Sequence, residues 1–319
     1  MTAAFSGVFL NSGVDSGDGG FQAGMIVPFG GINLLVLNNG MDLRIDHSKG
    51  IEVKEVTSLT TQMVASIAKA LSLDVSAFKI RLDGGGQRFF LVKGSAFIGK
   101  NKGEIRARRG RAAVAKIKVG VLPAKSFSVA IRQVQMYRTA AKDPKDVVLS
   151  SQDAFDPAKI LANMNSVWTP QTNISFTLAK TNPLLMPALP FDSEGPDAKN
   201  TAMTAAFEVM ALDDSKAHLT IFTVHKTFDG GFRNPVAGYT HAKSKFSVVA
   251  DHPLEFTFEH ETGHFLGALD AKGKFIGFTD LNGNWAEDYP HRAGTLMTVT
   301  EASNGRIPYD LAFDFNKGI

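Results

Sequence analysis

The chain has 319 residues, more than one typical domain needs, and its 44% hydrophobic and 20% charged residues are those of a globular protein with sizeable cores. It has no cysteine, which excludes disulfides, cysteine-based zinc sites and a thiol nucleophile, and its net charge of +3 indicates no particular partner. No apolar run approaches the length of a membrane-spanning helix. Residues 1–16 lack a basic start followed by an apolar core, so we expect no Sec signal peptide. Export by a signal-peptide-independent route and a cytoplasmic location both stay open.

The first part of the chain is rich in glycine and then in short strands. Closely spaced glycines make residues 1–24 a predicted flexible lead-in. Over residues 25–122, short apolar–polar alternations are separated by turn signals, which favours an all-β sandwich. Apolar residues four apart predict one helix over residues 59–71. Strands are predicted over residues 32–37, 43–46, 51–56, 78–82, 88–92, 103–108 and 113–119.

Residues 89–121 resemble the end of a bacterial Ig-like domain. A strand, Gly94, Gly99, a second strand and a basic alternating strand follow one another in this stretch. The resemblance implies an accessory module that positions or tethers a partner and carries no chemistry. We therefore expect residues 25–122 to form an Ig-like sandwich, with a docking partner as a further expectation.

A basic cluster lies in the same stretch. Strand alternation places Ala107, Ile117 and Val119 inward, so the basic side chains are predicted to form a solvated face. No aromatic residue lies between Gly99 and Phe127, and stacking surfaces for nucleic-acid bases are therefore missing. We expect no nucleic-acid partner, and an acidic protein surface stays open as an alternative. The basic residues are Lys100, Lys102, Arg106, Arg108, Arg109, Arg111, Lys116 and Lys118.

From residue 123 strands alternate with helices, which we interpret as a second domain over residues 123–319. Asp156 and Pro157 predict a helix start, with Asp as N-cap and Pro at the first helical position, and Pro170 is predicted to end that helix. Further strands are predicted over residues 127–131, 174–178, 219–224 and within 239–249, and helices over residues 203–212 and 309–315.

The most informative motif is the run from His260 to Asp270. His-Glu-x-x-His on a helix places His260 and His264 one turn apart on the same face, where both imidazoles can reach one Zn²⁺. Glu261 then lies beside the metal, positioned to take a proton from a zinc-bound water. Gly267 favours a helix-exit turn that brings Asp270 back as a third ligand. Three protein ligands and one open position are typical of a catalytic zinc.

Together with Gly294-Thr295-Leu296-Met297-Thr298 downstream, this run resembles the metzincin zinc peptidases, and its Asp variant is most similar to the snapalysin branch. The resemblance implies His260, His264 and Asp270 as ligands of one catalytic zinc, Glu261 as general base and Met297 as the Met-turn residue. It also implies an α+β domain with a mixed sheet, an active-site helix and a Met-turn. A peptide substrate would lie along an edge strand that includes Gly238 and Tyr239.

The chain departs from the family where several metzincins carry a Tyr two residues after the Met, because Val299 stands there. The group that stabilises the oxyanion is therefore open, with Tyr289, His291 and Tyr309 as candidates by residue type. His291 is also an alternative third ligand.

The sequence thus predicts a zinc endopeptidase, a hydrolase of the metalloprotease class, and a secreted protein is one of the two locations that stay open. Two alternatives stay open. One is a latent zymogen that the N-terminal domain inhibits, and the other is a delivered toxin effector or adaptor in which that domain serves for docking.

Overall fold

The computed structural model describes residues 3–7, 12–15, 22–57, 59–73, 86–137, 147–150, 156–180, 184–186, 195–214, 216–229, 235–241, 245–251, 256–267, 306–307 and 309–316. Over these residues the protein is mixed α/β, rich in strands and with few helices. The chain divides into two compact units. Unit 1 comprises Met1–Lys125, Asn165–Ser175 and Gly305–Ile319, and unit 2 comprises Ser126–Met164 and Phe176–Asn304. None of the helices in these ranges has the length and apolar composition to cross a membrane.

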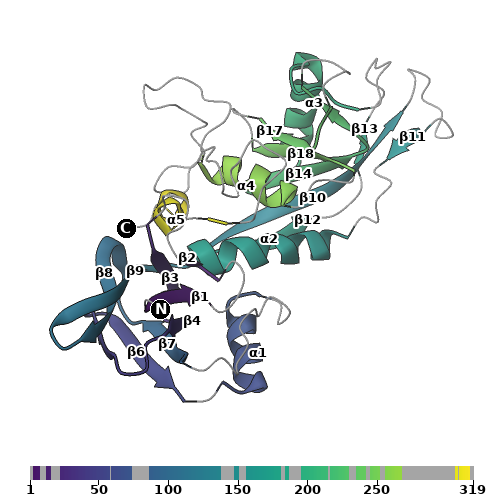
Figure 1. Ribbon diagram of the computed structural model, residues 1–319. Coiled ribbons are helices and arrows are strands. Elements are labelled where there is room, and N and C mark those ends of the chain that lie inside the picture. The colour runs from purple at the N-terminus through teal and green to yellow at the C-terminus, as the bar shows by residue number, and fades with distance from the viewer. Residues whose placement is uncertain are drawn as a thin grey trace, which may run out of the picture. The chain divides into compact units, whose positions relative to one another are not determined.

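Unit 1 contains two sheets that share one core (Figure 1). Buried residues of both sheets, such as Leu35 and Val119, pack in the same hydrophobic cluster. Strand pairs are antiparallel except for one parallel pair in the second sheet. The first sheet has the order β1 (Ala4–Gly7), β4 (Ile32–Asn38), β7 (Arg88–Gly94), β6 (Ile51–Val56). The second has the order β2 (Val14–Asp15), β3 (Gly24–Pro28), β9 (Ala112–Leu122), β8 (Ile98–Arg109), β5 (Arg44–His47), with β3 and β9 parallel.

Helix α1 (Thr61–Ala70) covers the other face of the first sheet. Leu34 and Val36 alternate with the core residue Leu35 and pack against Val64 and Ile67 of the helix. The predicted helix is therefore present. Because it packs on the sandwich as an additional layer, the all-β prediction is too narrow for this region.

Two strands lie within the predicted flexible lead-in of residues 1–24. Strand β1 pairs antiparallel with β4, and β2 pairs antiparallel with β3. Phe5 of β1 is 7% exposed and belongs to the sandwich core. The glycines predicted a linker, but backbone pairing and one buried aromatic hold residues 4–7 in the sheet.

Unit 1 also takes up residues that the predicted domain boundaries assign to the C-terminal domain. The edge of the Trp168 ring meets Phe315 of helix α5 (Tyr309–Asn316) at a centroid distance of 4.8 Å. Asn316 Nδ2 donates a hydrogen bond of 2.7 Å to the carbonyl of Thr172. Tyr309 is buried, and its ring fills the space that a Cβ at Gly24 would need. The domain boundaries at residues 25–122 and 123–319 themselves stay a prediction.

Unit 2 is built on a mixed sheet with the order β11-β10-β14-β18-β17. Strands β10, β14 and β18 are parallel, whereas β17 pairs antiparallel with β18 and is the outermost strand on its side within the described residues. Its strands are β10 (Lys125–Tyr137), β11 (Val147–Ser150), β14 (Leu219–Val224), β17 (Gly238–Thr240) and β18 (Phe246–Ala250), with β12 (Ile174–Lys180) and β13 (Leu184–Met186) paired to β10. A separate pair is formed by β15 (Thr227–Phe228) and β16 (Pro235–Val236).

Helices lie on both faces of this sheet. Met203 and Phe207 of α3 (Thr201–Leu212) pack in one cluster with Phe246 and Val248 of β18. Ser247 lies between those two residues and faces the opposite side, toward α4 (Thr257–Gly267). Helix α4 packs against β17 and β18, and Figure 1 shows it beside this sheet. The sheet therefore separates α3 from the helix that carries the zinc motif.

Helix α2 (Pro157–Thr172) begins where Asp156 and Pro157 predicted, and Asp156 Oδ1 accepts a hydrogen bond of 3.0 Å from Lys159 N. The prediction that Pro170 ends this helix is wrong, because Pro170 lies inside its last turn. The helix ends at Thr172, and the next residue, Asn173, has a left-handed φ of 56°. A proline in the last turn costs one backbone hydrogen bond, and the left-handed residue after it terminates the helix.

Candidate metal centre and general base

Helix α4 carries an unusual number of buried ionisable side chains. Glu259, Glu261 and His264 are 4%, 5% and 6% exposed, and they lie in a helix of 11 residues. Burying ionisable groups costs free energy unless they are paired or bound to an ion. Such groups in one short segment are typical of functional sites.

The two histidines converge. His260 Nε2 and His264 Nε2 are 3.1 Å apart, and their rings meet edge-on with centroids 4.8 Å apart. Two nitrogens at about 2.0–2.1 Å from one tetrahedral ion would be separated by about 3.3 Å. The pair therefore fits two of the ligands of a zinc ion, as their four-residue spacing predicts.

The remaining predicted metal-site residues, Asp270, Met297 and the alternative ligand His291, lie outside the described residues. Within the described ranges, no group of three or more His, Cys, Asp or Glu side chains is placed to hold one metal ion. Gly267 is the last residue of α4, so the predicted exit turn begins where the described segment ends. The third ligand stays a prediction.

Glu261 lies against the edge strand β17. Its Oε2 accepts a hydrogen bond of 2.7 Å from the hydroxyl of Thr240. A Cβ at Gly238 would lie 3.2 Å from its Oε1, so the strand backbone passes close to the carboxylate. Burial raises the pKa of the Glu261 carboxyl, while His260 and the Thr240 hydroxyl act in the opposite direction. A carboxyl with a raised pKa is suited to the exchange of protons near neutral pH.

Of the two predicted edge-strand residues, only Gly238 faces the motif helix. The Tyr239 side chain points to the other face of the sheet and packs against the cluster formed with α3. Burial raises the pKa of its phenol, and the hydroxyl has no hydrogen-bond partner among the described residues. Tyr239 thus contributes its backbone, and not its side chain, to the α4 side of β17.

Sequence reasoning missed Thr240. No motif marks it, and its contact with Glu261 joins residues 21 positions apart on a strand and a helix. The only available signal was spacing, since Thr240 lies two residues after Gly238 in the predicted edge strand and must share its face.

Sequence reasoning also missed a pair formed by one histidine and one aspartate. His225 Nδ1 and Asp251 Oδ2 are 3.0 Å apart, at the carboxyl ends of the parallel strands β14 and β18. The Asp251 side chain is 3% exposed, so this carboxylate fixes the orientation of the imidazole. Of the candidates for oxyanion stabilisation, Tyr309 packs in the interior of unit 1, and Tyr289 and His291 lie outside the described residues.

The basic cluster lies on the outer face of β8 and β9, as predicted. Ala107, Ile117 and Val119 are buried in the core, while Arg106 and Lys116 are exposed on the opposite face. Acidic neighbours partly balance this face, with Arg106 bound to Glu104 at 2.7 Å and Arg108 bound to Asp46 at 2.8 Å.

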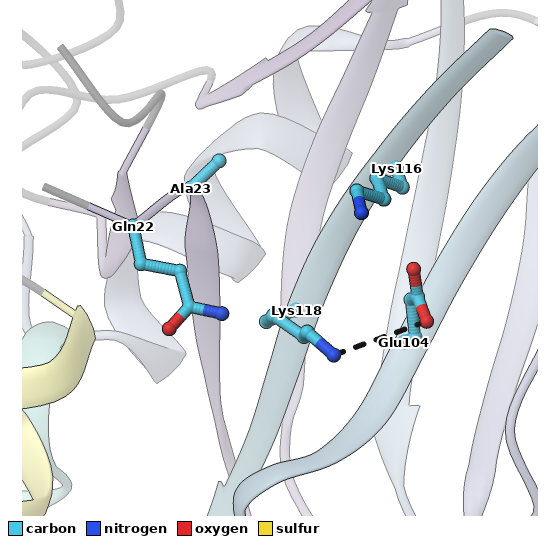
Figure 2. A pocket seen from close by; sticks show the side chains of 5 residues that line it. All are labelled: Gln22, Ala23, Glu104, Lys116 and Lys118. Atoms are coloured by element: carbon cyan, nitrogen blue, oxygen red, sulfur yellow. Dashed lines mark ion pairs between the residues drawn. The ribbon is translucent and has the colours of Figure 1, made fainter.

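Figure 2 shows the residues that line a cavity on this face, with the Lys118 ammonium directed at Glu104 at 4.0 Å. The cavity has a volume of about 230 Å³ and is lined by Gln22, Ala23, Glu104, Lys116 and Lys118. The hydrogen bond from Arg106 lowers the pKa of the Glu104 carboxyl. This is the electrostatics of a paired, solvated surface and differs from that of α4.

Neither the scan against protein-family models nor the search of curated proteins found a match for this chain.

Proposed function

We propose that this protein is a zinc-dependent endopeptidase in which Glu261 is the general base. The observation that carries the proposal is the convergence of His260 Nε2 and His264 Nε2 at 3.1 Å beside a buried carboxylate. Asp270 completes the proposed ligand set, as the metzincin resemblance implies. In such a site the chemistry that zinc supplies is a lower pKa of bound water and polarisation of the substrate carbonyl.

The residues of the chain have distinct proposed roles. His260 and His264 hold the ion, and Glu261 takes the proton of the attacking water and returns it to the leaving amine. The burial of Glu261 supports this role, because its raised pKa brings proton binding and release closer to neutral pH.

The proposed substrate is an extended peptide that pairs with the outer edge of β17. This strand is the outermost on its side within the described ranges, runs antiparallel to β18, and lies next to Glu261. An added strand would obtain affinity from main-chain hydrogen bonds. The finer fold, a metzincin-like unit 2 and an Ig-like sandwich in unit 1, belongs to the same proposal. It is supported by the mixed sheet beside α4 and by the two sheets with a common core.

The test is cleavage of a diverse peptide library by the full-length chain with zinc, beside Glu261→Gln. We expect cleavage by the wild type and a loss of about 10²–10⁴-fold in the variant. Glu52→Gln, a substitution at an exposed position of strand β6, is the matched control and should cleave like the wild type. Equal cleavage by the wild type and Glu261→Gln, or none by the wild type, would contradict the proposal.

A further inference from the structure

Strand β17 presents two features to Glu261, a hydrogen-bond donor and a residue without a side chain. Thr240 Oγ1 lies 2.7 Å from Glu261 Oε2 and is also 3.0 Å from the carbonyl oxygen of Glu261. Two residues earlier, Gly238 has no side chain, and a Cβ there would approach Glu261 Oε1 to 3.2 Å and the Val248 carbonyl oxygen to 3.0 Å. One carboxylate oxygen is therefore bound by a hydroxyl, and the other lies against the strand at a residue that has no side chain.

The Thr240 hydroxyl is itself held by a neighbour. Its register partner across the strand pair is Ser247, which is fully buried, and the two hydroxyl oxygens are 2.8 Å apart. A Thr hydroxyl has a single proton, and the charged carboxylate is the stronger acceptor. Since Thr240 donates that proton to Glu261, Ser247 must donate to Thr240. The result is a directed chain from Ser247 through Thr240 to Glu261.

The alternation of the strand makes this arrangement possible. Gly238 and Thr240 face α4, whereas Tyr239 between them packs against the cluster on the α3 side. Val248, the register partner of Tyr239, belongs to the same cluster and holds the pair of strands by packing on the α3 side of the sheet. The position of the Thr240 hydroxyl is thus fixed by packing on the far face of the sheet.

We infer that Thr240 is a positioning residue for the general base. It holds Oε2 of Glu261, supported in turn by Ser247, so that Oε1 is the oxygen that takes the proton. The inference rests on the proposed function. A hydroxyl that orients a buried carboxylate contributes about 10–100-fold to activity when it supports a metal site from outside the ligand set.

The first test compares Thr240→Val with Thr240→Ser in the full-length chain with zinc. Valine keeps the shape and removes the donor, and serine keeps the donor. We expect kcat to fall about 10–100-fold in Thr240→Val with little change in KM, and to return to within a few-fold of the wild type in Thr240→Ser. Ser247→Ala should give a smaller loss of kcat in the same direction. Equal kcat in Thr240→Val and the wild type, or equal losses in the valine and serine variants, would overturn the inference.

The second test does not depend on peptidase activity. A double-mutant cycle of Thr240→Val and Glu261→Leu is measured by urea unfolding of the full-length chain without added zinc. Because a hydrogen bond to a charged group is involved, we expect non-additivity of about 10-fold in the unfolding equilibrium constant. Additive effects would overturn the inference. If the wild type cleaves no peptide, the proposed function fails, and this cycle still decides whether Thr240 holds Glu261.

Discussion

Helix α4 of unit 2 and the hairpin of β8 and β9 in unit 1 both carry ionisable side chains, but these side chains are mostly buried in α4 and mostly exposed on the hairpin. The hairpin has the denser run of charges, yet Arg106 and Lys116 are exposed, and its buried residues are all apolar or glycine. Helix α4 has few charges, but Glu259, Glu261 and His264 are all buried. Burial of charge, and not its density along the sequence, therefore distinguishes a candidate reaction site from a solvated face.

The largest expected effect tests the α4 side of this comparison. His264→Ala removes one of the converging nitrogens, and we expect the affinity of the chain for zinc to fall at least about 100-fold, with loss of peptide cleavage. His47→Ala, at an exposed position on β5, is the control and should leave zinc affinity unchanged. Competition with a chelating dye measures both. Equal zinc affinity in His264→Ala and the wild type would show that α4 does not provide the zinc site.

A second prediction concerns a buried ion pair of unit 2 to which no function is assigned. Arg132 and Asp214 form an ion pair in unit 2 with side chains 6% and 1% exposed, at 2.9 Å. Arg132→Ala leaves a buried carboxylate without this partner and should lower the free energy of unfolding by about 3–5 kcal/mol. The double variant Arg132→Met/Asp214→Leu should recover most of that loss, because no charge is then left buried. Urea denaturation measures both variants, and a loss below about 1 kcal/mol in Arg132→Ala would contradict the account.

The pH dependence of stability should have opposite signs in the two regions. Burial raises the pKa of Glu261, so its contribution to stability is present below the unfolded pKa and is lost as the pH rises through the folded pKa. Glu261→Gln, without added zinc, should therefore gain stability over the wild type as the pH rises. The bond from Arg106 lowers the pKa of Glu104, so its contribution is present above the unfolded pKa and is lost as the pH falls.

Glu104→Gln should accordingly be less stable than the wild type at neutral pH, by less than about 1 kcal/mol, and the difference should vanish in acid. Urea denaturation between about pH 2 and pH 8 measures both variants, because the contribution of Glu104 is lost only below the ordinary pKa of a glutamate. If the two substitutions changed stability with the same dependence on pH, the contrast between the regions would be refuted.

The smallest effect is expected on the hairpin surface. Lys116 is exposed and lines the cavity beside Lys118, and Lys116→Ala should change the free energy of unfolding by no more than about 0.5 kcal/mol. Ile117→Ala, one residue on and 1% exposed, is the matched comparison and should cost about 2–5 kcal/mol. Thermal unfolding of the two variants checks this, and similar losses in both would show that the hairpin face is not merely solvated.

The sequence predicted most of what depends on local pattern. Period-two alternation found β5 and β6, four-residue spacing found α1, and the His-Glu-x-x-His run found α4 and the convergence of His260 and His264. Long-range packing was not readable from these patterns. The glycines of residues 1–24 predicted a flexible segment, so β1 was not predicted. The strand character of β1 depends on its pairing with β4. The prediction that Pro170 ends helix α2 failed because the tertiary contacts of Trp168 and Asn316 stabilise the helical turn around this proline.

At the site itself, the missing information was which strand lies against the carboxylate. Gly238 was predicted as an edge-strand residue, but nothing local relates Thr240 to Glu261, because their contact requires the sheet to form first. The same holds for the pairing of His225 with Asp251, which joins the ends of two parallel strands. Asp270 and Met297 lie outside the described residues and stay predictions.

The central claim is that His260 and His264 bind one zinc ion, and zinc K-edge absorption spectroscopy of the full-length chain tests it most directly. The account predicts one zinc per chain, with two imidazole nitrogens at about 2.0–2.1 Å and oxygen ligands completing the shell. The imidazole signal should be lost in the double variant His260→Ala/His264→Ala. A chain that retains no zinc, or a zinc shell unchanged in that variant, would contradict the claim.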